Sequence, residues 1–92
     1  METKLISIII PTFGRAEFVE RSIESVLNQS YKNIELIIVD DNGLGSNDQK
    51  KTYNTVAKYI EKGEKVKYIP HEQNKNGAVA RNTGIKHAKG EY

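Results

Sequence analysis

The stretch Ile6-Ser7-Ile8-Ile9-Ile10-Pro11-Thr12-Phe13-Gly14-Arg15 is an apolar run that reaches a proline, and the run over residues 34–39 leads into Asp40-Asp41. Short, nearly continuous runs of β-branched residues are typical of parallel strands buried on both faces. We therefore predict strands over residues 5–10 and 34–39, the first ended by Pro11, which lacks an amide hydrogen. Ligands of parallel α/β sheets bind outside the carboxyl ends of the strands, so the residues after these runs are the first candidates for a site.

Helical periodicity fills the segments between the strands. Residues 15–29 and 46–63 each place apolar side chains on one helical face, and the second segment has a capping box at Ser46 and Gln49 and a glycine stop at Gly63. The expected faces are Val19, Ile23, Val26 and Leu27 with Phe18 beside them, and then Tyr53, Val56, Ala57 and Ile60. A short strand over 66–69 is closed by Pro70, residues 74–77 form a turn, and a third helix covers 77–88 with Gly90 past its end.

This alternation predicts an α/β fold in three α/β/α layers, with a parallel sheet of order 3-2-1. The first strand would then be an open edge, and an apolar edge invites pairing with another chain. We therefore expect the chain to self-associate through that edge or through an uncovered apolar face.

Length and composition narrow the class of protein. The chain has 92 residues, 37% hydrophobic and 28% charged, with a net charge of +2 and no cysteine. These values indicate one soluble globular domain with a thin core, and they argue against nucleic acid as a partner. A thiolate metal site or cysteine nucleophile is excluded. The first apolar run is too short for a signal sequence or membrane span, which favours a cytoplasmic location.

The acidic pair Asp40-Asp41 allows two interpretations. Neighbouring strand residues point to opposite faces, so the two carboxylates cannot form a facing acid/base dyad. Both could simply shape the turn into Asn42-Gly43. Alternatively, one carboxylate accepts a hydrogen bond from a ligand imide or hydroxyl.

Other polar and aromatic residues are open to the same two kinds of interpretation. Phe13 could cover the core or stack on a flat ring, and Arg15 lies at a helix start, where anions are favoured. Gly84 inside a helix costs about 1 kcal/mol relative to alanine, which indicates close packing against the sheet or a ligand. Arg81 could be a surface residue or a ligand contact. His71 and His87 lack metal-ligand spacing, so we expect exposed histidines in a loop and at a helix end.

Two classes of α/β protein fit poorly. A dinucleotide-binding oxidoreductase needs G-x-G-x-x-G in its first turn, but residues 11–15 contain one glycine. A phosphoacceptor signalling module needs an aspartate after the third strand, where Pro70 and His71 stand. A non-catalytic α/β binding or assembly module stays as the alternative.

The ordered motifs resemble the inverting family 2 glycosyltransferases of GT-A fold. The resemblance covers nearly the whole chain and rests on Ile10-Pro11-Thr12-Phe13, Ser25-Val26-Leu27-Asn28-Gln29-Ser30-Tyr31, Glu35-Leu36-Ile37-Ile38-Val39-Asp40-Asp41, residues 74–84 and Gly90-Glu91-Tyr92. Many relatives have asparagine where this chain has Gly14, so we expect a local change in that turn.

The resemblance implies roles for particular residues. Pro11, Thr12 and Phe13 would form the base pocket of a nucleotide-sugar site, with Asp41 on the uracil imide. Arg81 would be a further nucleotide contact. From its place at a helix start we expect Arg15 to be another. Asp40, Gly77 and Gly84 would be structural residues at the site.

The resemblance also implies an activity for a longer protein. Residues 1–92 would be the N-terminal nucleotide-sugar-binding half of a domain, cut before an Asp-x-Asp motif that binds Mn²⁺ or Mg²⁺, so neither metal ligands nor catalytic residues are expected here. The intact enzyme would transfer a sugar with inversion from a nucleotide-sugar, by preference a UDP-sugar with a guanosine or thymidine sugar as fallback. A saccharide or lipid-linked acceptor and a role in polysaccharide biosynthesis are expected, with the parent protein cytoplasmic or peripheral at the inner face of the membrane.

Overall fold

Three strands and three helices alternate along the chain. The computed structural model describes residues 4–14, 16–29, 33–73, 75 and 77–90. In order, the elements are β1 (Ile6–Thr12), α1 (Ala16–Leu27), β2 (Ile34–Asp40), α2 (Asn47–Glu61), β3 (Val66–Pro70) and α3 (Gly77–His87). Arg15, Asn74 and Asn76, which belong to the predicted nucleotide contact and turn, lie outside the described residues.

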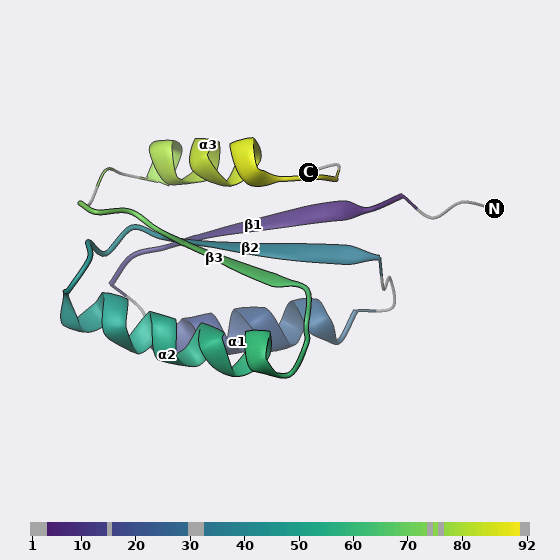
Figure 1. Cartoon of the computed structure of the whole chain (residues 1–92), viewed down its shortest axis with the longest axis horizontal. Coiled ribbons are helices and arrows are strands. Elements are labelled where there is room, and N and C mark those ends of the chain that lie inside the picture. The colour runs from purple at the N-terminus through teal and green to yellow at the C-terminus, as the bar shows by residue number, and fades with distance from the viewer. Residues whose placement is uncertain (1–3, 15, 30–32, 74, 76, 91–92) are drawn as a thin grey trace.

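The strands form one parallel sheet with β2 in the centre (Figure 1). Helices α1 and α2 cover one face of the sheet and α3 covers the other. The α/β class, the three layers and the predicted strand order are therefore confirmed. Strands β1 and β3 are the two edges of the described sheet.

The predicted end of the first strand at Pro11 is wrong. Strand β1 continues to Thr12, with Pro11 in register with Val39 of β2 and Thr12 in register with Asp40. A proline can stay in an edge strand because its missing donor need not break the ladder to the neighbouring strand. The strand thus carries Thr12 up to the same edge as the end of β2.

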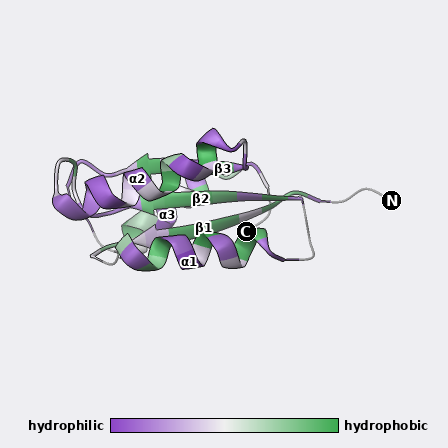
Figure 2. Cartoon of the chain, turned by 90° about the horizontal axis from the view of Figure 1, so that it is seen from below, coloured by the Kyte–Doolittle hydropathy of each residue, from purple (hydrophilic) through white to green (hydrophobic). Residues whose placement is uncertain are grey.

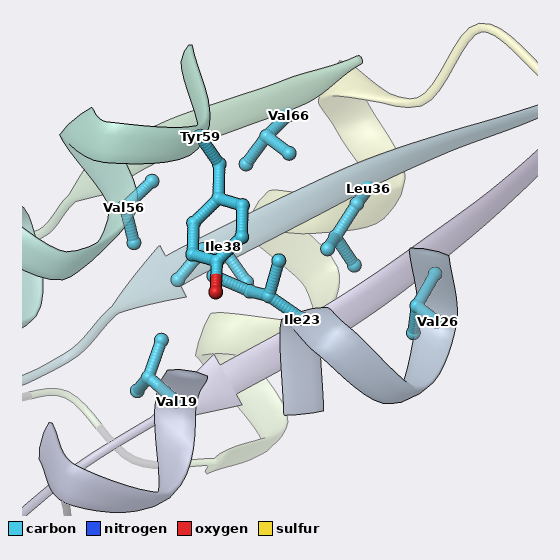
Figure 3. Packing of buried hydrophobic residues seen from close by; sticks show 8 residues of the cluster. All are labelled: Val19, Ile23, Val26, Leu36, Ile38, Val56, Tyr59 and Val66. Atoms are coloured by element: carbon cyan, nitrogen blue, oxygen red, sulfur yellow. The ribbon is translucent and has the colours of Figure 1, made fainter. Parts of the chain in front are cut away.

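The two faces of β2 supply two apolar cores. Leu36 and Ile38 pack with α1 and α2, and Figure 3 shows them among Val19, Ile23, Val26, Val56, Tyr59 and Val66. Ile37 and Val39 point the other way and pack with Ala80 of α3. Hydrophilic and hydrophobic residues alternate along the helices, whereas β1 and β2 are hydrophobic over much of their length (Figure 2). Burial on both faces explains why β2 reads as a continuous apolar run.

The predicted apolar face of α2 is partly wrong. The buried residues are Thr52, Val56 and Tyr59, whereas Tyr53 and Ile60 are 49% and 43% exposed. Tyr59 can occupy the core because its hydroxyl donates to Glu24 Oε1 of α1 at 2.6 Å. Burial and this hydrogen bond raise the pKa of Tyr59 to about 12. The helix therefore turns a polar-ended aromatic ring inward, which a simple apolar pattern does not predict.

The helix ends follow the sequence signals. Ser46 Oγ accepts from the Gln49 amide at 3.1 Å, while Gln49 Oε1 accepts from the Gly45 amide at 3.2 Å. At the other end of α2, Gly63 has φ +84°, which suits glycine, and its amide donates to the Ile60 carbonyl. The Ser46 cap and the glycine stop are confirmed. The return half of the capping box differs from the prediction, because Gln49 reaches the amide of Gly45, whereas the Ser46 amide donates to the Gly43 carbonyl.

Candidate functional site

The carboxyl ends of the three strands meet at one edge of the sheet. Thr12, Asp40 and Pro70 are aligned across β1, β2 and β3. Two further backbone hydrogen bonds extend this alignment, from the Asp41 amide to the Thr12 carbonyl at 2.9 Å and from the His71 amide to the Asp40 carbonyl at 2.8 Å. The residues after all three strands are thereby held side by side.

The first turn presents an aromatic ring to solvent. Phe13 is 63% exposed, so its alternative role as a cover for the core is wrong. A hollow of about 190 Å³ lies beside it, lined by Pro11, Thr12 and Phe13 and by residues of α1. The Gly14 amide donates to Asn42 Oδ1 at 2.6 Å, which ties the first turn to the turn after β2. Gly14 has φ +71°, a conformation that asparagine also tolerates better than most residues.

Asp40 is fully buried and its hydrogen bonds lie within the fold. Its Oδ1 accepts from the Asn42 amide at 3.1 Å and from Asn42 Nδ2 at 2.7 Å, which shapes the turn after β2. Its Oδ2 accepts from the Tyr68 hydroxyl at 2.6 Å, and Gln49 Nε2 of α2 donates to the same hydroxyl at 2.9 Å. Burial and the Asp40 carboxylate raise the pKa of Tyr68 well above its usual value, which keeps the hydroxyl as a donor.

Asp41 makes contacts with a different set of residues. Its Oδ1 lies 2.8 Å from His71 Nδ1 and accepts from the Lys75 amide at 2.9 Å. Only 4% of its side chain is exposed. The two aspartates thus have separate partners, Asp40 towards β3 and α2 and Asp41 towards the segment between β3 and α3. A ligand that binds Asp41 has to share or replace some of the hydrogen bonds of this carboxylate.

The expectation that His71 is an exposed loop residue is wrong. His71 is 7% exposed, with Nδ1 on Asp41 and Nε2 2.8 Å from Thr83 Oγ of α3. A search for metal-ligand spacing overlooks this role, because the partners of His71 are a carboxylate and a hydroxyl. The available signal was its position directly after Pro70, at the same edge as Asp41. His87 is exposed near the end of α3, as predicted, and its Nδ1 donates to the Thr83 carbonyl at 2.9 Å.

Helix α3 carries the remaining predicted residues. Gly77 begins the helix and Arg81 is exposed on it. The close packing expected at Gly84 is present, because a Cβ there would overlap Ile9 Cγ2 of β1. Gly84 therefore lets α3 lie close against β1.

The described residues do not supply a metal site. Among them, no three His, Asp or Glu side chains gather where they could hold an ion. The adjacent aspartates do not point toward a common ion site, because Asp40 faces Tyr68 and Asn42 while Asp41 faces His71.

The opposite end of the sheet holds another cavity, of about 530 Å³, between the ends of α1 and α2 and the start of β2. Its lining includes Leu27, Ile34, Tyr59 and Lys62. Near that end, Glu35 is buried beside Ser7 and Lys67. The polar groups that converge from three strand ends favour the carboxyl edge as the candidate site.

Comparison with known proteins identifies the family. The model of "Glycosyl transferase family 2" matches residues 7–92. The chain belongs to glycosyl transferase family 2. Across the part of this family 2 chain that the structure describes, none of the helices has the length and apolar character needed to cross a membrane.

Several relatives resemble this family 2 chain over nearly its full length. It is 46% identical over 92 residues to poly(ribitol-phosphate) beta-N-acetylglucosaminyltransferase TarP of Staphylococcus aureus, an alignment that covers 97% of this chain and 26% of TarP. An uncharacterized glycosyltransferase of Haemophilus influenzae is 41% identical, with 100% of this chain and 35% of that protein covered. The chain thus spans about a quarter to a third of these relatives.

A solved structure has the same fold. The mannosyltransferase PcManGT from Pyrobaculum calidifontis, in complex with GDP-Man and Mn²⁺, superposes with a TM-score of 0.81 at 21% sequence identity. The match covers 98% of this chain and 26% of the mannosyltransferase. The glycosyltransferase fold inferred from the sequence motifs is therefore confirmed for this family 2 chain.

Proposed function

We propose that residues 1–92 are the N-terminal nucleotide-sugar-binding half of a glycosyltransferase domain. The observation that carries this proposal is the gathering of an exposed aromatic ring, a hollow and two aspartates at the carboxyl edge of a family 2 sheet. In the proposed complex Phe13 stacks on the nucleobase, Pro11 and Thr12 line its pocket, and Asp41 accepts from the base imide. Asp40, Gly77 and Gly84 keep the turns and α3 in place.

A UDP-sugar is the proposed donor. A carboxylate that accepts a hydrogen bond suits the imide N–H of uracil, and Arg15 and Arg81 supply cations for the diphosphate. A guanosine nucleotide is the second candidate, because the base of guanosine also offers N–H donors and PcManGT is solved with GDP-Man. Both bases present a flat ring on which Phe13 can stack.

The intact protein is proposed to transfer the sugar with inversion to a saccharide or lipid-linked acceptor. Inversion follows from a single in-line displacement at the anomeric carbon, with a carboxylate as general base on the acceptor hydroxyl. Because the described residues hold no metal cluster, we assign neither the proposed Mn²⁺ or Mg²⁺ nor the general base to them. A cytoplasmic enzyme of polysaccharide biosynthesis, peripheral at the inner face of the membrane or free of it, is the setting we propose.

A titration of the ¹⁵N-labelled chain with uridine, UDP, guanosine and GDP tests the proposed donor. We expect uridine and UDP to shift the amide signals of Thr12, Phe13 and Asp41. Phe13→Ala should weaken binding about tenfold, because base–aromatic stacking contributes about 1–3 kcal/mol. Ile60→Ala, which also shortens an exposed apolar side chain but at the far end of α2, should leave binding unchanged.

Asp41→Asn tests the role of the carboxylate in the same titration, and the ¹⁵N spectrum of the variant shows whether the fold is kept. The amide keeps the size of the carboxylate but offers only one acceptor oxygen, so binding of the base should weaken. Shifts only with GDP would replace the uridine assignment by the guanosine one. A folded spectrum that none of the four ligands changes would contradict a base pocket within this chain and favour the non-catalytic binding module.

We also propose that the chain self-associates through the edge of β1. Within the described residues β1 pairs with β2 alone, and Ile6 on this strand is 36% exposed. An edge strand of this kind is a template for pairing with another chain.

A further inference from the structure

His71 is a buried polar side chain that no role proposed above uses. Its ring connects two elements, because Nδ1 lies 2.8 Å from Asp41 Oδ1 and Nε2 lies 2.8 Å from Thr83 Oγ of α3. Its backbone is fixed as well, since the His71 amide donates to the Asp40 carbonyl at 2.8 Å. The ring therefore has little freedom to turn away from Asp41.

The direction of these hydrogen bonds follows from the chemistry of the partners. An ionised carboxylate only accepts, so Nδ1 of His71 must carry a hydrogen and donate it to Asp41. The Lys75 amide donates to the same Oδ1 at 2.9 Å. Asp41 Oδ1 is thus held by one side-chain donor and one backbone donor that come from different segments.

Thr83 fixes the other end of the ring. Its hydroxyl lies 3.0 Å from the Val79 carbonyl, one turn earlier in α3, and 2.8 Å from His71 Nε2. The Thr83 hydroxyl donates its one hydrogen to the Val79 carbonyl, so a charged imidazole donates from Nε2 to Thr83 Oγ without disturbing that bond. A neutral imidazole can accept from the hydroxyl only if this hydrogen turns from Val79 to Nε2. In both forms Nδ1 keeps its hydrogen, so the contact with Asp41 does not depend on the charge of the ring.

We propose that His71 is a positioning residue that holds the Asp41 carboxylate in one orientation relative to α3. The value of this orientation for nucleobase recognition rests on the proposed function. The positioning of Asp41 by His71 does not rest on the proposed function, because it concerns only contacts within the chain. A buried carboxylate held by fixed donors needs little reorganisation when a ligand binds, which favours affinity.

Two substitutions separate the two ends of the ring. The amide nitrogen of asparagine can take the place of Nδ1, so His71→Asn keeps a donor for Asp41 and loses the contact with Thr83. The longer glutamine puts its amide nitrogen near Nε2, so His71→Gln keeps a partner for Thr83 and loses the donor to Asp41. A purely structural role for the buried ring would make the two variants alike. His87→Asn and His87→Gln at the exposed histidine serve as matched controls.

The first measurement needs no ligand. We expect ¹⁵N spectra of the His71 ring to show a protonated Nδ1. Hydrogen exchange of the Lys75 amide should accelerate about tenfold in His71→Gln, since loss of a hydrogen bond to a charged group releases the carboxylate. The Asp41 carboxyl ¹³C signal should move in that variant, while both readouts stay near wild type in His71→Asn. An unprotonated Nδ1, or equal changes in the two variants, would overturn the proposal.

Titration with uridine and UDP then tests the link to recognition. If wild type binds, His71→Gln should bind about tenfold more weakly and His71→Asn should stay within about threefold of wild type. Equal binding by wild type and His71→Gln would overturn the role in recognition. If wild type binds neither ligand, His71→Gln and His71→Asn can still differ in Lys75 exchange and in the Asp41 carboxyl signal. In that case the positioning role is supported and the proposed function alone fails.

Discussion

At the scale of single residues, Glu35 is the buried acid whose environment most clearly affects stability. Burial by itself raises the pKa of this carboxyl, but hydrogen bonds from Ser7 Oγ at 2.6 Å, Lys67 Nζ at 2.9 Å and the Lys89 amide at 2.7 Å outweigh it. The pKa falls from its ordinary value of 4.5 to about 2. Because the folded state binds this proton less readily than the unfolded state, the carboxylate stabilises the fold above pH 4.5.

This stabilisation should disappear as the pH falls from about 4.5 towards 2. We expect the free energy of unfolding to drop over this range by on the order of 3 kcal/mol through Glu35 alone. Urea unfolding of wild type, Glu35→Gln and the exposed control Glu61→Gln at several pH values measures the difference. Glu35→Gln should be less stable at neutral pH and less sensitive to acid. If the free energy of unfolding of Glu35→Gln fell with pH as steeply as that of Glu61→Gln, the result would contradict the assigned hydrogen bonds.

At the scale of elements, the close packing of α3 against the sheet depends on Gly84. Alanine there would gain about 1 kcal/mol in helix propensity. The alanine Cβ would overlap Ile9 Cγ2 and lie close to Ile9 Cγ1 and Cβ. These atoms are next to the backbone, so the Ile9 side chain cannot move aside easily. Overpacking of this kind costs about 1–3 kcal/mol, so Gly84→Ala should lower the free energy of unfolding.

A double-mutant cycle with Ile9→Ala tests the contact. The truncated side chain leaves room for the new methyl group, so the cost of Gly84→Ala should shrink or change sign in that background. Lys86→Ala, at an exposed position of the same helix, controls for propensity. If Gly84→Ala alone increased the free energy of unfolding, the result would contradict the close contact.

The elements were largely predictable because each carries its own local signal. Apolar runs identified the buried strand β2, and Ser46 and Gly63 marked the ends of α2. Two errors have a common cause, because Pro11 inside β1 and Tyr59 inside the core depend on neighbours that periodicity does not include. Strand order placed Thr12 and Asp41 at one edge, but the contact of His71 with Thr83 depends on how α3 folds back, and no local pattern encodes it.

At the scale of the whole molecule, self-association through β1 predicts a concentration-dependent mass. Static light scattering over a wide concentration range should show dimers or larger species. Ile6→Lys should shift the equilibrium towards monomer, because a charge on an edge strand discourages pairing. Ile60→Lys, at a comparably exposed position on α2, should not do so. A constant monomeric mass for wild type would contradict the proposal.

The hydrogen bond from the Gly90 amide to Ser7 Oγ, at 2.9 Å, joins residues 83 positions apart. The Lys89 amide reaches Glu35 across 54 positions. Contacts of such long sequence separation form late, because the entropy of closing the loop must be met first. On a translating ribosome, Glu35 would therefore wait for one of its three partners until residue 89 has left the exit tunnel. Docking of α3 should then be a late step in the folding of residues 1–92, and until it occurs Glu35 would have only Ser7 and Lys67 as partners.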